Sequence, residues 1–272
     1  MTQYIEFLLW PFLACVILVG IHVYFGLHVI RRGIIFVDLS LAQVAALGTT
    51  LAFLLGFGLD GNTAYLFSLG FALLGGVIFA FTRGIEGKIP QEAIIGIVYA
   101  VSSSAAILAV SHAPEGAEHI RYLLVGSLLT VTPLAVLKTA IVYALVGLFH
   151  YLTRAQFIGL TFGEGPKPRH PLVWDVLFYA SFGVVVTSSV KICGVLLVFI
   201  FLVVPSVFGA LITDSIGRRL ALGWVFGLVG SLVGLILSFA LDTPPGATIV
   251  CTFGIMLLAF AALRPLGRAR TA

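Results

Sequence analysis

The amino-acid sequence predicts an all-α protein that crosses a membrane many times, and three observations support this prediction. Hydrophobic residues make up 60% of the 272 residues and charged residues only 10%, whereas a soluble domain is usually about one quarter charged. The run from Ile192 to Thr213 contains no charged residue, which is long enough for a helix to cross the ~20-residue hydrocarbon core of a bilayer. Similar apolar runs alternate with short interruptions along the whole chain. We therefore expect one transmembrane domain, residues 1–272, without a substantial soluble domain.

Nine membrane spans follow from the order of the apolar runs. The expected spans cover residues 5–30, 35–55, 65–81, 93–110, 134–152, 173–190, the run that starts at residue 191, 220–241 and 249–263. The apolar piece 122–131 is too short to cross a bilayer and predicts an interfacial or re-entrant segment. The longest polar interruption, 155–171, contains Lys167 and Arg169 together with Gly and Pro, and predicts a cytoplasmic loop.

The distribution of basic residues predicts the orientation of the chain. Arg31 and Arg32 follow the first span, so we expect the N-terminus outside the cell and this end of the span inside. With nine spans, 12 of the 15 Lys and Arg residues fall on the inner side, and three, Arg121, Lys138 and Lys191, fall toward the outer side. This bias predicts an N-out, C-in protein and explains the net charge of +4 without a nucleic-acid partner.

The run from Lys191 to Arg219 contains a candidate contact segment for a soluble partner. Because Pro205 interrupts its far end, we expect the spanning helix to break there and to continue as a short segment at the cytoplasmic face. This segment either receives force from a soluble partner or is a helix end with a loop. Its candidate contact residues are Pro205, Val207, Phe208, Leu211, Ile212, Arg218 and Arg219.

Polar residues inside a span are costly in lipid and indicate a pathway. Asp38, Ser40 and Gln43 form such a group at the inner part of the second expected span. Asp38 is close to the end of this span, so it either sits at the interface or belongs to a path. Gln43 lies roughly opposite Asp38 in helical angle, so the two face one cavity only if the helix is broken between them. Asp175 and Lys191 are expected to reach water at the inner and the outer face.

Imidazole and carboxylate groups gather in one expected outer loop, at His112, Glu115, Glu118 and His119. These groups suit zinc, manganese and ferrous iron. Pro114 and Gly116 indicate a turn. The segment is therefore either a solvated acidic loop or a weak metal handover site.

No catalytic constellation is present in the sequence. The chain contains no Walker A, HExxH or GxSxG pattern, so we expect a transport subunit and not an enzyme. If transport uses ATP, another chain must bind the nucleotide.

The cysteines are isolated in apolar runs and predict neither a disulfide framework nor a CxxC metal site: Cys15, Cys193 and Cys251. His22 and His28 are six residues apart and are expected to pack rather than to bind metal.

Five stretches resemble one family of membrane proteins when they are taken together. They are LAQVAALG (41–48), AIIGIVYAVSSSAAIL (93–108), YLLVGSLLTVTP (122–133), KICGVLLVFIFLVVPSVFGALIT (191–213) and LDTPPGATIV (241–250). In this order they resemble the permeases of bacterial metal ABC transporters, the ABC-3 family of the type II importer class. The resemblance covers nearly the whole chain.

This resemblance implies a type II ABC importer permease fold and a multi-pass homodimer in the bacterial cytoplasmic (inner) membrane. The implied partners are an ATP-binding cassette ATPase subunit and a periplasmic or lipoprotein metal-binding protein. The implied mechanism is alternating access driven by ATP hydrolysis in the ATPase, with a coupling helix after Pro205. The transported substrate would be a divalent metal (Zn, Mn or Fe), with zinc and manganese ahead of iron, and no cofactor would be tightly bound.

The second expected span departs from the family pattern. Many relatives carry an aspartate and a histidine four residues apart, as in GDTLAHA, and the aligned positions here are Leu39 and Gln43, with Asp38 one residue earlier. Because a glutamine oxygen is a weak ligand, the metal would pass through a loosely coordinating cavity, or the substrate is a metal complex. Two alternative functions also stay open. One is a secondary metal-ion transporter, and the other is a type II permease for a chelate such as cobalamin or haem.

Overall fold

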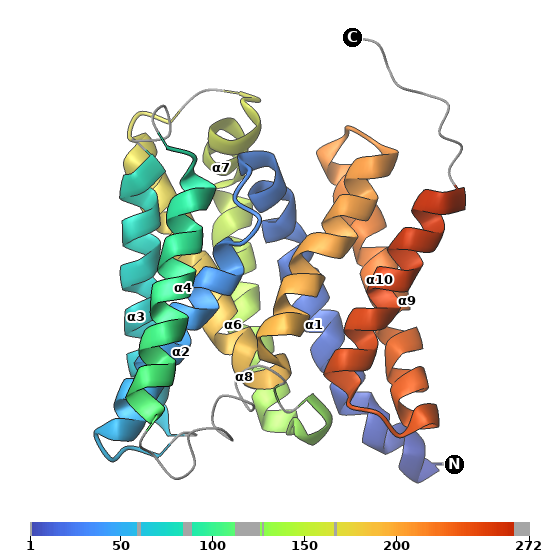
Figure 1. Cartoon of the computed structure of the whole chain (residues 1–272). Helices are drawn as coiled ribbons and strands as arrows, with labels where there is room; N and C mark the ends of the chain where they lie inside the picture. Colours follow the sequence, from blue (N-terminus) through green and yellow to red (C-terminus); the bar gives the residue numbers. More distant parts are fainter. Residues whose placement is uncertain are drawn as a thin grey trace.

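The computed structural model describes residues 2–58, 61–83, 89–111, 126, 128–165 and 168–263, with side chains from residue 8 onward. Every regular element in these ranges is a helix (Figure 1). The helices are α1 (Thr2–Arg32), α2 (Val37–Leu54), α3 (Asn62–Thr82), α4 (Gln91–Val110), the short 3-10 helix η2 (Leu128–Thr130), α6 (Pro133–Leu152), α7 (Arg154–Phe162), α8 (Pro171–Ile212), α9 (Ile216–Leu241) and α10 (Pro245–Leu263).

Eight of the described helices are long and apolar enough to cross a membrane. One of them, α8, has 42 residues, which is about 63 Å of helix and twice the ~30 Å hydrocarbon core. At Gly194 its backbone leaves the helical conformation (φ 75°, ψ 165°), and the chain turns back there (Figure 1). The two halves of α8, 171–193 and 195–212, therefore cross separately. With the seven other helices they make nine membrane-crossing segments in the described chain, and the predicted all-α polytopic fold is confirmed.

The ends of the helices agree with the predicted orientation. In Figure 1, α1 begins at the lower face and α10 ends at the upper face. The described basic residues near the upper ends of helices are Arg31, Arg32, Arg83, Arg154, Arg169, Arg218 and Arg219. Lys138 and Lys191 lie near the lower ends of α6 and of the first half of α8. The upper face is therefore the cytoplasmic side by the positive-inside rule.

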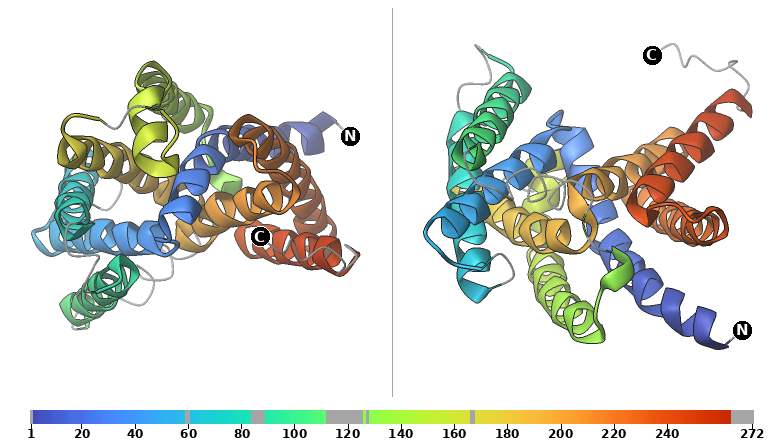
Figure 2. Two further views of the ribbon diagram at one scale, coloured as in Figure 1. Left: turned by 90° about the horizontal axis from the view of Figure 1, so that it is seen from above. Right: turned by 60° about the horizontal axis from the view of Figure 1, so that its bottom comes forward.

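The core of the bundle lies where α1 packs against α8. α1 contacts α6, α7, α8 and α9, with α2–α4 on one side of the bundle and α9–α10 on the other (Figure 2). The ring of Phe25 lies 5.5 Å from that of Phe178 and 4.9 Å from that of Phe182, and all three are fully buried. Gly26 faces Leu202 and Ser206 so closely that a side chain at this position would collide with them. Small residues permit such close approach between membrane helices.

The apolar piece 122–131 is described at Gly126 and from Leu128 onward. Leu128 is buried, and η2 contacts α1 and α10. The backbone of Gly126, at φ 68°, lies directly against Cys193 and Gly194, where α8 turns back. This described part enters the bundle at its outer end, as expected for a re-entrant segment.

The prediction of a plain loop over residues 155–171 is wrong, because this region contains α7. The sequence RAQFIGLTF buries Phe157 completely and also buries Gly159, so packing supports a short helix here. The helix ends at Gly163, whose left-handed backbone (φ 74°) favours glycine. A glycine directly after an apolar run is a sequence signal that could have identified this helix.

Candidate functional site

One face of α2 is left open by the rest of the chain. Leu39, Gln43 and Leu47 are half-buried and Leu51 is 37% exposed, whereas the other residues of Val37–Ala52 are buried. These four residues, the α2 stripe, are spaced four apart and therefore share one side of the helix. Gln43 is the polar side chain of this stripe.

Asp38 and Ser40 point away from the α2 stripe. Asp38 is 1% exposed and Ser40 is fully buried. Neither carboxylate oxygen of Asp38 has a side-chain hydrogen-bond partner in the described chain, and the neighbouring donors are the backbone N–H groups of Asp38 and Leu39. These amides are at the N-terminal end of α2, where the helix dipole favours a negative charge. The structure therefore places Asp38 inside the subunit, and Asp38 and Gln43 face different surroundings.

The second half of α8 continues the open face. Leu196 is 53% exposed, and the residues that follow it on the same side are half-buried: Phe199, Ile200, Val203 and Val207. The ring of Phe36, just before α2, stacks on Phe199 with centroids 5.9 Å apart. The backbone N–H of Phe36 donates to Glu92 Oε1 at 2.9 Å. The two helices therefore present one largely apolar surface, which we call the open face.

The predicted outer cluster cannot be placed on this framework. His112, Glu115, Glu118 and His119 lie outside the described residues. Among the residues that are described, no group of three or more His, Cys, Asp or Glu side chains is arranged to hold a metal ion.

The predicted helix break at Pro205 is wrong. α8 continues through Pro205 to Ile212. A proline removes one backbone hydrogen bond, but the neighbouring helices support this turn: Ser206 Oγ donates to the carbonyl of Val23 in α1 at 3.1 Å. In a membrane bundle such side-chain bonds and packing let a helix continue past a proline.

The residues predicted to contact a partner after Pro205 divide between the core and the surface. The ring of Phe208 lies 4.3 Å from that of Phe226 and 4.8 Å from that of Phe260, so this half-buried side chain packs against α9 and α10. Leu211 and Ile212 are about 40% exposed at the end of α8. The remaining predicted residues are Pro205, which is buried, Val207 on the open face, Arg218, which is exposed, and Arg219. Arg219 closes the α8–α9 turn, because Nη2 donates to Asp214 Oδ1 at 2.9 Å and Nε to the carbonyl of Thr213 at 2.6 Å.

The helix that sequence reasoning missed, α7, is tied to three membrane helices at the cytoplasmic end. Thr161 Oγ1 accepts from Arg32 Nε at 3.0 Å and shares a hydrogen bond of 2.8 Å with His28 Nδ1, both on α1. The carbonyl of Leu160 accepts from Arg83 Nη2, directly after α3, at 3.3 Å. The ring of Phe157 stacks on His150 at the end of α6, with centroids 4.2 Å apart.

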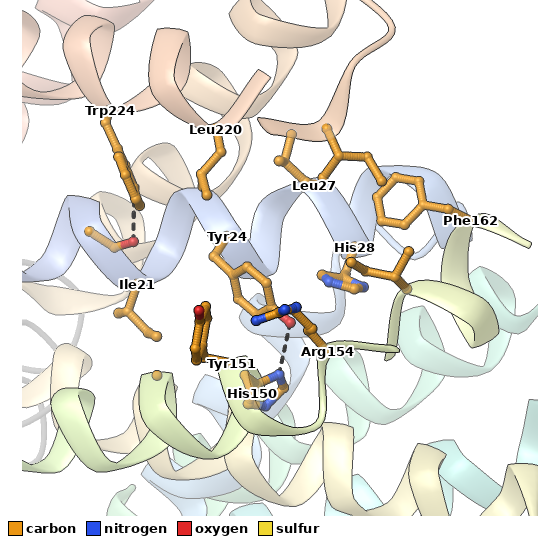
Figure 3. Close-up of a pocket in the computed structure, with 14 residues that line it drawn as sticks. Ile21, Tyr24, Leu27, His28, His150, Tyr151, Arg154, Phe162, Leu220 and Trp224 are labelled. Carbon is orange, nitrogen blue, oxygen red and sulfur yellow. Dashed lines mark hydrogen bonds between the residues drawn. The ribbon is translucent and has the colours of Figure 1, made fainter. Parts of the chain in front are cut away.

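A cavity of about 310 Å³ lies between α1, α6, α7 and the start of α9 (Figure 3). On its wall Tyr24 Oη and His150 Nδ1 share a hydrogen bond of 3.0 Å, and Trp224 Nε1 donates to the carbonyl of Gly20 at 3.0 Å. His150 Nε2 also bonds to Ser181 Oγ at 2.8 Å. His28 and His150 therefore act as packed, hydrogen-bonded residues, as expected for His28.

Asp175 also differs from its predicted position. It is 4% exposed and lies between two arginines, Arg32 and Arg83, instead of reaching water. The sequence separations of these residues, 143 and 92 positions, explain why the pairing is not visible in the sequence.

Comparison with known sequences agrees with the resemblance noted from the motifs. Residues 4–264 match the ABC 3 transport family. The chain belongs to this family. It is therefore a membrane transport protein of the ABC 3 family and not an enzyme in its own right.

Several named membrane proteins are similar to the chain over part of its length. A "Probable iron transport system membrane protein" of Haemophilus influenzae is 23% identical over 65% of this chain and 67% of its own length. The "Manganese transport system membrane protein MntC" of Listeria monocytogenes is 24% identical, over 61% of this chain and 60% of its own length. The "Chelated iron transport system membrane protein YfeC" of Yersinia pestis is 25% identical, over 60% of this chain and 56% of its own length.

Solved structures show the same fold. A chain of PsaBC from Streptococcus pneumoniae, in complex with Fab, superposes with a TM-score of 0.77 at 20% identity, over 97% of this chain and 94% of that one. A chain described provisionally as a metal-chelate type ABC transporter, in an inward-facing conformation, superposes with a TM-score of 0.69 at 19% identity, over 96% of this chain and 87% of that one. The ABC 3 chain therefore has the fold of an ABC transporter permease, as predicted.

Proposed function

We propose that this ABC 3 chain is the membrane-spanning permease subunit of an ATP-driven importer for a divalent transition metal. The observation that carries the proposal is the family match over residues 4–264. The names of the similar proteins favour manganese and iron over zinc. The proposed partners are an ATP-binding cassette ATPase, a periplasmic or lipoprotein metal-binding protein and a second copy of the permease, all at the bacterial cytoplasmic membrane.

The open face supports assembly from two copies. A single subunit leaves the α2 stripe and the outer side of the second half of α8 only partly covered. In a two-fold symmetric dimer the same face of each subunit meets its counterpart, so the path would run between two open faces. Gln43 from each subunit would then be the polar group that faces the substrate. Asp38, which is buried behind this face, would support α2 and would not coordinate metal.

We propose that α7 transmits force from the ATPase. It is a separate short helix at the cytoplasmic end, and its N-terminal residues Arg154 and Ala155 are exposed. Its other end is bonded to α1 and to the end of α3, so a displacement of α7 would be passed to these helices. The segment after Pro205 fits this role less well, because its aromatic residue, Phe208, is already engaged by Phe226 and Phe260 of the same subunit. The α8–α9 turn beside it remains a second contact point.

A metal complex is a second candidate substrate, and the composition of the α2 stripe favours it. Leu39, Leu47 and Leu51 accompany Gln43 at positions that face the proposed path. A chelated metal carries its own ligands, so one amide per subunit would be sufficient to guide it. If the substrate is a free metal ion, the outer residues would hand over the metal that the binding protein releases: His112, Glu115, Glu118 and His119. A chelate would not need them.

Transport by reconstituted protein tests these proposals. The chain is purified with its ATPase and placed in vesicles, and the uptake of Mn²⁺, Fe²⁺, Zn²⁺ and preformed iron–citrate is measured with ATP or a non-hydrolysable analogue. We expect uptake of manganese or iron that requires hydrolysable ATP. Uptake of iron–citrate without uptake of free ions would establish the chelate function. Uptake by the chain without the ATPase would contradict the importer proposal and indicate a secondary transporter.

A further inference from the structure

The cavity beside α7 lies within the depth of the membrane. Its floor is one side of α1, from Gly20 to His28, and its walls are the end of α6, α7 and the start of α9 (Figure 3). Gly20 precedes the end of α1 at Arg32 by twelve residues, which is about 18 Å along the helix. The cavity therefore extends from the cytoplasmic interface into the adjoining half of the hydrocarbon core. Its lining in the described chain includes no residue of α2 or α8, so it is separate from the open face.

The mouth of the cavity faces lipid. Tyr151 at the end of α6 is 63% exposed and Trp224 of α9 is 40% exposed, and both line the cavity. Beside them, Leu148 and Val225 are more than half exposed. Apolar side chains that are exposed on membrane-spanning helices contact acyl chains, and Trp and Tyr gather near the headgroups. A lipid can therefore enter the cavity from the side without leaving the membrane.

The cavity stays open because two membrane helices place glycine on its wall. Gly20 of α1 and Gly147 of α6 both line it, and a Cβ atom added at either position would meet nothing within 4 Å. Two polar groups on the walls are already bonded within the subunit, since Trp224 Nε1 donates to the carbonyl of Gly20 and the Tyr24 hydroxyl is bonded to His150. Apolar cavities offer water few partners, and they stay dry or take apolar ligands. An acyl chain therefore fits this cavity better than water or a metal ion does.

The cytoplasmic end of the cavity is positively charged. Arg154, at the start of α7, lines the cavity, and its guanidinium lies 4.5 Å from the ring centre of Tyr151, a cation–π contact. Within the described ranges no carboxylate forms an ion pair with Arg154. Arg31 adds a second positive charge, because it is exposed and lies one turn after Leu27 of the floor, on the same side of α1. This combination of an apolar cavity and a cationic end matches the acyl chain and the phosphate of an anionic phospholipid.

We propose that this cavity binds an anionic phospholipid of the cytoplasmic leaflet, with one acyl chain along α1 and the phosphate at Arg154 and Arg31. Basic pockets between membrane helices on the cytoplasmic side bind anionic headgroups in this way. The bound lipid would hold the start of α7 beside α1 and α9. This proposal does not depend on the transported substrate.

Native mass spectrometry of the full-length chain in detergent tests the headgroup contact. Dioleoyl phosphatidylglycerol, which is anionic, and dioleoyl phosphatidylcholine, which is zwitterionic and has the same chains, are added at equal concentration. We expect preferential retention of the anionic lipid. Its retention should fall about fivefold in Arg154→Gln, the contribution of one basic residue at an anionic surface, and should persist in Arg154→Lys. The matched control is Arg169→Gln, which removes an exposed charge outside the cavity and should leave retention unchanged.

Gly147→Leu tests the acyl-chain contact, because it fills the cavity from α6. A side chain has room at this position and leucine favours a helix more than glycine does, so the Tm should not fall, whereas retention of the anionic lipid should fall at least as far as in Arg154→Gln. Gly254→Leu in α10 is the control, because a side chain there also meets open space but does not line the cavity. If Gly147→Leu lowers the Tm, Gly20→Leu fills the same cavity from α1 and repeats the test.

Three outcomes would overturn the proposal. They are equal retention of the two lipids, unchanged retention in Arg154→Gln, and unchanged retention in a folded cavity-filling variant. Displacement of the lipid by glycerol 3-phosphate, which has the headgroup chemistry without acyl chains, would indicate a small-anion site and would also overturn it. Because the ATPase is absent from this measurement, the result is independent of the coupling role proposed for α7.

Discussion

Arg32, the last residue of α1, and Asp175, near the start of α8, form a buried ion pair. Arg32 Nη1 lies 2.9 Å from Asp175 Oδ1, and the two side chains are 4% and 5% exposed. Arg83, directly after α3, reaches the same oxygen at 2.5 Å. The guanidinium of Arg32 also lies 3.9 Å from the ring centre of Phe178, and its Nε donates to Thr161 of α7. One carboxylate thus holds the cytoplasmic ends of α1, α3 and α8 and, through Arg32, of α7.

The first prediction concerns this carboxylate. Asp175→Asn leaves the buried guanidinium of Arg32 without its counter-charge, and such a change costs about 3–5 kcal/mol. We expect a large drop in the Tm of the purified chain in detergent and loss of ATP-driven uptake.

Asp214→Asn is the matched control, because Asp214 is 84% exposed and pairs with Arg219 at the surface. A surface pair contributes about 0–1 kcal/mol, so the Tm should change little. Equal shifts in the two variants would show that the buried pair does not hold the helix ends together.

The second prediction concerns the turn inside α8. Gly194 has φ 75° and ψ 165°, a conformation that costs other residues about 1–3 kcal/mol. We therefore expect Gly194→Ala to reduce the folded fraction of the protein, measured by size-exclusion chromatography of a fluorescent fusion. Gly254→Ala in α10 is the control, because a side chain there would meet open space. A normal yield of Gly194→Ala would mean that the reversal of α8 tolerates a side chain.

The third prediction distinguishes the two polar positions of α2. Gln43 lies on the α2 stripe, so Gln43→His should introduce a metal ligand into the proposed path. We expect more metal to be retained by the purified permease–ATPase complex and slower release, because conduction requires binding that is weak enough for the ion to leave. Metal content by mass spectrometry and the uptake rate in vesicles check this result.

Asp38→Asn provides the comparison, because Asp38 is buried away from the stripe. The amide has nearly the same shape and no charge to bury, so uptake should persist. Loss of uptake with an unchanged Tm would show that Asp38 contributes to the metal path, as the sequence analysis expects.

The fourth prediction concerns coupling. Arg154→Glu/Ala155→Asp changes two exposed residues of α7 and should reduce copurification of the ATPase at least about tenfold if they lie at the centre of the contact. The Tm of the chain should stay unchanged. Leu211→Asp tests the α8–α9 turn in parallel. Release of the ATPase by Leu211→Asp, with no effect of the α7 variant, would place coupling in the segment after Pro205.

The sequence by itself determined the class of fold, the number of spans and the orientation of the chain. Each span can be recognised from its own residues, because the thickness of the bilayer sets the length of its apolar run. The orientation follows from the basic residues beside the spans, which gather on one side of the membrane. The motifs were also sufficient for the family, because the five matching stretches keep their order over nearly the whole chain. The sequence signal for α7, which the sequence analysis missed, is also local, because Gly163 directly follows the apolar residues of this helix.

The tertiary structure alone decided where each polar residue lies. Asp38 and Gln43 occupy the same helix, and burial by neighbouring helices leaves only Gln43 on the open face. Pro205 has the sequence signature of a helix break, but the second half of α8 stays helical through it, where Ser206 bonds to the carbonyl of Val23 in α1. Asp175 finds Arg32 and Arg83 across 143 and 92 positions of sequence. Such pairings depend on how the helices pack, because a buried polar group needs a partner, and the arginines that pair with Asp175 belong to other elements of the chain.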